Sequence, residues 1–229
     1  SLRSGILSSE EFLQGISRER VGVEMTKILT GENVHSIIDQ MLSLGVLDRV
    51  FENMHVELPP ELSTEYLVNL ALLFRNSELS GEELASKMRD LLVLSKNDLL
   101  EISMMHECRY LSLDVTIESA RRFHAAVSDR RKRMIMSYLE KNGIETEKFE
   151  KLFRSINPED LILKPMVDGE RLANVTGLIP GPRLGRLKGW LHRRQIEEAS
   201  RTEEDVLQFL SDIDWKSSDY QEWKALSWP

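Results

Sequence analysis

The chain has 229 residues, of which 41% are hydrophobic, and its formal net charge is −8 at neutral pH. This composition is enough for one sizeable core or two smaller ones, and no apolar run approaches the roughly 18 residues that a membrane-spanning helix needs. The acidic total argues against a surface that wraps nucleic acid nonspecifically, and the single cysteine excludes an internal disulfide or a cysteine zinc cluster.

Helical periodicity runs through nearly the whole chain. Ser17 is expected to cap a helix that ends at Gly31, and Asn33 is expected to begin a second helix that stops at Gly45. The segment STEYLVNLALLF, residues 63–74, is apolar around most of its circumference and predicts the most buried helix.

Further along the chain, SGEE from Ser80 has the spacing of a capping box in which Glu83 reaches back to the helix start. One long helix is predicted over about residues 114–142, closed by Gly143. TEED from Thr202 is a similar start for a helix near the C-terminus. We therefore expect an all-α fold.

The sequence signals for strands and for domain boundaries are weaker than those for helices. Only LILKPMV, residues 161–167, could be extended, and Pro165 weakens it as a strand. Prolines and a glycine interrupt the helical rhythm over residues 155–172, which predicts a larger helical part before this segment and a smaller one after it. The last 16 residues hold three of the four tryptophans, which either pack the last helix onto the body or form a stacking platform for bases.

Most candidate catalytic residues lack the neighbouring elements or partner residues that catalysis would need. Asp212 and Asp214 have the spacing of a paired metal carboxylate, but they follow a helix rather than a strand or a Gly-rich phosphate turn. The five histidines show no paired spacing, His124 lies on an apolar stripe, and Cys108 has no partner that would make it a nucleophile. We expect no catalytic residue and no metal site in this chain.

Binding is better supported, because positive charge is concentrated in two tracks. One carries five cations with no acid between them: Arg183, Arg186, Lys188, Arg193 and Arg194. The other is diluted only by Asp129: Arg121, Arg122, Arg130, Arg131, Lys132 and Arg133. A localised basic track on an acidic body can still contact a polyanion.

The first track begins in GLIPGPRLGRLKGWL, residues 177–191. Pro182 suits the first turn of a helix, and Gly181 would let a phosphate approach the free N–H groups there. Gly185 and Gly189, four residues apart, would permit a close helix crossing. The alternative is an ordinary surface helix that happens to begin with proline.

Two segments, residues 16–34 and residues 167–210, resemble the C-terminal helical region of the eukaryotic and bacterial (class II) CCA-adding enzymes of the tRNA nucleotidyltransferase and poly(A) polymerase family, and VGVEM at residues 21–25 is similar to the eukaryotic, fungal type. The first is ISRERVGVEMTKILTGENV, residues 16–34, which is similar to the family's fifth head-and-neck motif through Arg20 and Glu24. On a helix these two side chains would face each other and could tie its first turns to an adjacent segment. The second, residues 167–210, is similar to the family's closing pattern around Gly-x-x-Pro-Gly-Pro.

The resemblance implies an all-α neck (residues 1–45), body (46–156) and tail (157–229), without the family's α/β catalytic head. That head carries a Gly-Ser turn, an Asp-x-Asp metal pair and a Glu-Asp-x-x-Arg nucleotide motif. The chain offers only EDLIL at Glu159, with Leu163 in place of the arginine. An initial Ser1 in place of Met is compatible with a processed or excised piece.

By the same resemblance, these parts would grip the acceptor arm and elbow of tRNA. A head upstream or in trans would add CCA from CTP and ATP with Mg²⁺. The residues expected to contact tRNA are Gly181, Pro182, Arg183, Arg186, Lys188, Arg193 and Arg194. The expected location is a reducing compartment: cytoplasm, nucleus or mitochondrion. The alternatives are a stand-alone, non-catalytic RNA-binding or adaptor protein and a structural helical domain with a protein partner.

Overall fold

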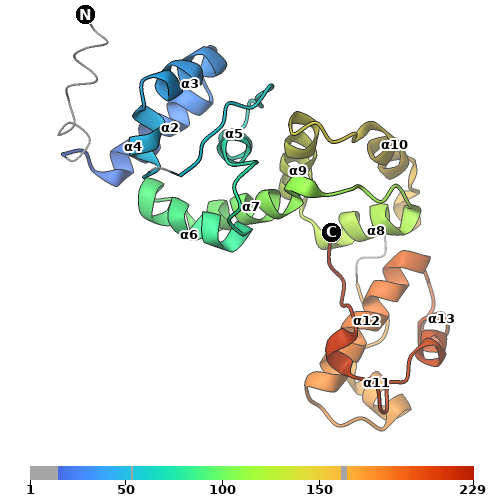
Figure 1. The fold of residues 1–229 in the computed structure, drawn as a ribbon. Coiled ribbons are helices and arrows are strands. Elements are labelled where there is room, and N and C mark those ends of the chain that lie inside the picture. Colours follow the sequence, from blue (N-terminus) through green and yellow to red (C-terminus); the bar gives the residue numbers. More distant parts are fainter. Residues whose placement is uncertain (1–14, 53, 161–163) are drawn as a thin grey trace, which may run out of the picture. The chain divides into compact units, whose positions relative to one another are not determined.

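The computed structural model describes residues 15–52, 54–160 and 164–229 (Figure 1). Within these ranges the secondary structure is helical and no strand is present, which confirms the all-α fold. Part of the possible strand, residues 161–163, lies outside the described residues, as does Leu163 of EDLIL. The contacts between residues divide the chain into two compact units, which we describe separately.

The first unit comprises residues 1–112 and 133–145. Its helices are α2 (Arg18–Leu29), α3 (Val34–Ser43), α4 (Val46–Val50), α5 (Tyr66–Leu73), α6 (Gly81–Leu92), α7 (Lys96–Glu107), the 3₁₀ turn η1 (Cys108–Tyr110) and most of α9 (Asp129–Lys141).

The second unit comprises residues 113–132 and 146–229. Its elements are α8 (Ile117–Ala126), α10 (Glu147–Ser155), η2 (Pro158–Asp160), α11 (Gly169–Thr176), α12 (Pro182–Glu198), α13 (Glu203–Gln208), η3 (Phe209–Asp212) and η4 (Tyr220–Glu222). These boundaries do not coincide with the neck, body and tail boundaries at residues 45 and 156, which stay a prediction from the resemblance.

The predicted helix starts are confirmed where a side chain caps the backbone. The Ser17 hydroxyl accepts a bond from the amide of Arg20 (3.4 Å), and the Thr202 hydroxyl accepts one from Asp205 (3.1 Å). At Ser80 both halves of the capping box are present, since the Glu83 carboxylate accepts a bond from the Ser80 amide (2.8 Å). These short-range bonds satisfy amides that have no partner within the helix.

Helix α5 is the core of the first unit, as its sequence predicts. Every residue of Leu67–Leu73 is buried. The one polar member, Asn69, is satisfied: its amide donates to the carbonyl oxygens of Leu29 and Ser63, each at 2.7 Å. A buried amide with bonded partners costs little and fixes how α5 and the end of α2 pack.

The prediction of one helix over residues 114–142 is wrong. The segment forms α8 and α9, separated at Val127, which has extended backbone angles, and Ser128. The carbonyl of Ser128 accepts a bond from the Lys132 amide (2.9 Å), so a new helix begins there. Serine followed by Asp129 is a helix-start signal, and burial of Val127 holds the chain in the extended conformation.

In the second unit, α12 supplies the central leucines of a core made of Val167, Leu172, Leu184, Leu187, Leu191, Val206 and Trp223. Trp228 is also buried and packs on Phe123, with ring centroids 4.4 Å apart. The tryptophans near the C-terminus that are most buried therefore pack the core, which agrees with the first of the two interpretations.

The close helix crossing predicted at Gly185 and Gly189 is wrong. A Cβ added at Gly185 would meet nothing within 4 Å, so no element of the described chain approaches there. At Gly189 the neighbour is Ala225 of the non-helical C-terminal segment, 3.1 Å from such a Cβ. The missing side chain thus admits a stretch of irregular backbone rather than a helix.

Candidate nucleic-acid interface

The start of α12 has the geometry that its sequence predicts. Pro182 is the first helical residue, and Gly181 precedes it in a fully extended conformation (φ 167°) without a side-chain cap. Both residues are exposed, and a Cβ at Gly181 would lie no closer than 4.0 Å to another atom, the carbonyl oxygen of Ile179. The first residue of this helix and the glycine before it are therefore open to solvent.

Arg183 is bound by its own chain. Its guanidinium donates to the carbonyl oxygens of Trp215 and Ser218, each at 2.8 Å, and lies over the rings of Tyr220 and Trp223, 5.3 Å from each centroid. These contacts hold the C-terminal segment against α12. Arg183 is thus a structural residue whose charge lies close to the helix start.

Arg186 and Lys188 differ from Arg183. Arg186 is exposed and Lys188 half-buried, and within the described residues neither side chain has a hydrogen-bond or ion-pair partner. Because a helix turns about 100° per residue, these two side chains lie about 200° apart around α12. They can bind two different phosphates but not the same one.

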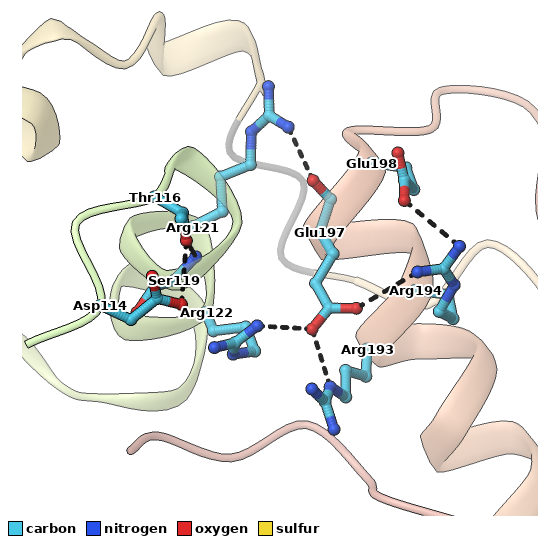
Figure 2. A network of polar contacts seen from close by, with 9 residues as sticks. All are labelled: Asp114, Thr116, Ser119, Arg121, Arg122, Arg193, Arg194, Glu197 and Glu198. Atoms are coloured by element: carbon cyan, nitrogen blue, oxygen red, sulfur yellow. Dashed lines mark hydrogen bonds and ion pairs between the residues drawn. The ribbon is translucent and has the colours of Figure 1, made fainter.

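The other two predicted contacts, Arg193 and Arg194, belong to a network around Glu197 (Figure 2). The Glu197 side chain is 8% exposed and accepts bonds from Arg193 Nε (2.8 Å) and Arg122 Nη1 (2.6 Å). Arg194 forms weaker ion pairs with Glu197, Glu198 and Asp212, at 3.7, 3.2 and 3.6 Å.

Two residues of the second basic track, Arg121 and Arg122, join the same network. Arg121 donates to the backbone carbonyl of Glu197 (2.7 Å), so α8 and α12 are tied together by both arginines of α8 (Figure 2). Lys132 is 9% exposed and bonds Asp129 (2.9 Å). Much of the positive charge that is conspicuous in the sequence is therefore neutralised within the fold.

The pair Arg20 and Glu24 lies on α2, where both side chains are exposed. Glu24 forms an ion pair with Lys27 at 2.9 Å, and no bond from Arg20 to Glu24 is present among the described residues. Arg20 thus presents its guanidinium to solvent. The expectation that Arg20 and Glu24 tie the first turns of α2 to an adjacent segment stays a prediction.

The weak catalytic candidates have structural roles. The Ser217 hydroxyl donates to the Asp214 carboxylate and, together with the amides of Ser217 and Lys216, holds the pKa of Asp214 below the usual range. Burial raises the pKa of the Cys108 thiol to about 12, so it stays protonated and is a poor nucleophile. Across the described parts of the chain, no cluster of His, Cys, Asp or Glu could hold a metal ion.

A feature that the sequence did not reveal is a recess of about 390 Å³ beside the second half of α12. Trp190 and Arg193 lie in its wall together with Glu222 and Lys224, which are more than 25 residues away in sequence. The spacing of Arg186, Trp190 and Arg193 along one helix face was the available signal. No nearby sequence pattern indicated that residues of the C-terminal segment would lie beside that face.

Residues 2–58 match the family described as "Probable RNA and SrmB- binding site of polymerase A". The match ends before α5 and supports the resemblance to the poly(A) polymerase and CCA-adding family for this part of the chain, with RNA binding as its role. No curated protein matches the chain. In the described residues no helix is both long and apolar enough to cross a membrane.

Proposed function

We propose that this chain is the tRNA-binding helical portion of a CCA-adding tRNA nucleotidyltransferase. The observation that carries the proposal is the family match over residues 2–58, within which the Arg20 and Glu24 motif lies. The closing pattern over residues 167–210, in a different part of the chain, supports the same family. Addition of C, C and A from CTP and ATP, with Mg²⁺, belongs to a catalytic head in this proposal.

The contacts of α12 support a choice among the residues that would bind RNA. Arg186 and Lys188 have charges available for phosphates, whereas Arg183, Arg193 and Arg194 are held by carbonyl or carboxylate oxygens of the chain. Phosphate contacts fix position without reading sequence, which suits a protein that must accept every tRNA. We assign the phosphate contacts of this helix to Arg186 and Lys188.

A second candidate function is a stand-alone, non-catalytic RNA-binding or adaptor protein. The charge of the matched segment favours it: residues 2–58 contain five Lys and Arg against nine Asp and Glu. A segment with this excess of negative charge gains little from phosphates, and the family description names SrmB beside RNA as bound at the site. In this alternative the chain would bind RNA without serving a nucleotidyltransferase.

Binding is tested by measuring the affinity for a tRNA without its CCA end at several salt concentrations. Arg186→Glu and Lys188→Glu should each weaken binding and make the slope of log affinity against log salt shallower by roughly one unit. Lys151→Glu is the matched control, because Lys151 is exposed in the same unit and the charge change is identical. Equal slopes for all three variants would contradict the assignment.

The link to CCA addition is tested by incorporation of CTP and ATP into the same tRNA in the presence of Mg²⁺. We expect no incorporation by this chain alone, and incorporation when a catalytic head of the family is fused upstream or added in trans. Binding of tRNA without any support of a head would favour the adaptor function. Incorporation by the chain alone would refute both functions.

A further inference from the structure

The recess beside α12 is built by the fold. Trp190, Arg193 and Arg194 of α12 line it on one side, and Asp212, Glu222 and Lys224 line it on others. All of these residues belong to the second unit. Its volume of about 390 Å³ is within the usual range for small-ligand sites.

Two anchors bring the C-terminal segment to this place. Trp223 is 5% exposed and packs in the core, and its indole N–H donates to the Ser218 hydroxyl (3.0 Å). Gly189 admits Ala225 against α12. Glu222 and Lys224, on either side of Trp223, are exposed and complete the wall.

The groups in the recess match a nucleobase. Trp190 is half-buried, packs against the core and supplies an aromatic wall. Glu222 and Lys224 have no partner within the described residues, and the Nη atoms of Arg193 likewise have no recorded bond. A flat ring beside free donors and a free acceptor can stack a base and bond its edge.

Charge argues against a phosphate as the occupant. The lining holds three cations (Arg193, Arg194, Lys224) and three anions (Glu197, Asp212, Glu222), so the recess has no net charge. Arg186 lies one turn before Trp190 on the same face of α12, about 6 Å away along the axis. A nucleotide whose base occupies the recess can place its phosphate at this unpaired guanidinium.

We propose that the recess binds one unstacked nucleotide of an RNA, with the base against Trp190 and the phosphate at Arg186. This inference rests on the proposed RNA-binding function and specifies its ligand: RNA with an unpaired, splayed-out base. A fully paired duplex lacks such a base and binds only through its phosphates.

The test compares affinities for tRNA and for a blunt RNA duplex of similar length. Trp190→Leu should lower the affinity for tRNA by roughly 5-fold to 100-fold, since stacking on an aromatic residue contributes that much per base. The salt slope should not change, because no phosphate contact is lost. The affinity for the duplex should not change either.

Because Trp190 also packs against the core, a second variant avoids the risk of unfolding. Glu222→Ala combined with Lys224→Ala removes two exposed side chains and leaves the net charge at −8. The control is Glu147→Ala with Lys151→Ala, an exposed pair in the same unit. Only the first double variant should weaken tRNA binding, by several-fold.

The outcomes separate this inference from the proposed function. Normal tRNA binding by both recess variants, with the fold intact by circular dichroism, would overturn the recess site and leave the proposed function standing. The protein could instead bind unstructured RNA oligonucleotides but not tRNA. If both recess variants lost that binding, the result would support the recess site and refute the tRNA function. Loss of duplex binding in the recess variants would overturn the recess as a base site.

Discussion

At the scale of single residues, Glu197 decides what the basic tracks can do. Its carboxylate is buried among Arg122, Arg193 and Arg194, and its backbone carbonyl accepts a bond from Arg121. A buried carboxylate is tolerated only when it is paired and hydrogen-bonded, and here it meets both conditions. Because these arginines are paired with Glu197, their positive charges are less available to bind a phosphate.

Glu197→Ala should therefore lower the free energy of unfolding by about 3 kcal/mol, the lower end of the cost of breaking a buried ion pair, because Arg122 and Arg193 are 17% and 23% exposed and water can partly compensate them. Urea unfolding followed by circular dichroism measures this change. Glu198→Ala is the neighbouring control: its carboxylate is half exposed and pairs with Arg194 at 3.2 Å, so the loss should stay below about 1 kcal/mol. Equal losses for the two variants would show that the network around Glu197 contributes no more to stability than the exposed Glu198 pair.

The sequence predicted the positions of positive charge but not which charges are free. Arg183 and Arg186 are three residues apart on one basic helix, yet only Arg183 bonds the carbonyls of Trp215 and Ser218. Those oxygens lie 32 and 35 residues away along the chain. No local pattern encodes such a contact, because it depends on the path of the C-terminal segment.

At the scale of elements, helix starts were predictable and helix lengths were not. A cap such as Ser80 with Glu83 acts over three residues, so its bonds can be read from the chain. The break between α8 and α9 at Val127 needs burial as well as a start signal, and burial is a property of the tertiary fold. Helix α7, capped by Ser95, was not among the expected helices, although its cap has the same form.

The capping box permits a direct measurement. Ser80→Ala should destabilise the protein by about 1 kcal/mol, because the Glu83 amide loses its acceptor. Ser86→Ala, at an exposed interior position of the same helix, should change stability by no more than about 0.5 kcal/mol or increase it slightly. Thermal unfolding of both variants at one pH gives the comparison. A larger loss for Ser86→Ala would contradict the capping role.

At the scale of the whole molecule, the buried His106 and the half-buried His124 should make stability depend on pH. Burial lowers the pKa of His106, whose Nε2 lies 2.9 Å from the Leu79 carbonyl, and the charge of Arg109 lowers it further. Burial and Lys132 lower the pKa of His124 in the second unit. The folded protein thus binds fewer protons than the unfolded chain below the ordinary histidine pKa of about 6.5.

The unfolding free energy should be highest above about pH 6.5 and should fall as the pH drops from there toward 5. Denaturant titrations at pH 7.5, 6.5, 5.5 and 5.0 measure the decline. His106→Gln should flatten it even if the variant is less stable overall. His35→Gln, at an exposed position, should leave the decline intact. A decline that is identical in both variants would exclude His106 as a source.

The network around Glu197 also affects how tightly a ligand could be held nearby. Arg193 has its Nε fixed by a carboxylate, so its long side chain is already ordered before any RNA arrives. An arginine on an open surface loses rotamer freedom when it binds, and that loss subtracts from affinity. Here the bond to Glu197 restricts the rotamers of Arg193 during folding, so its remaining N–H groups can bind a ligand with a smaller loss of side-chain entropy.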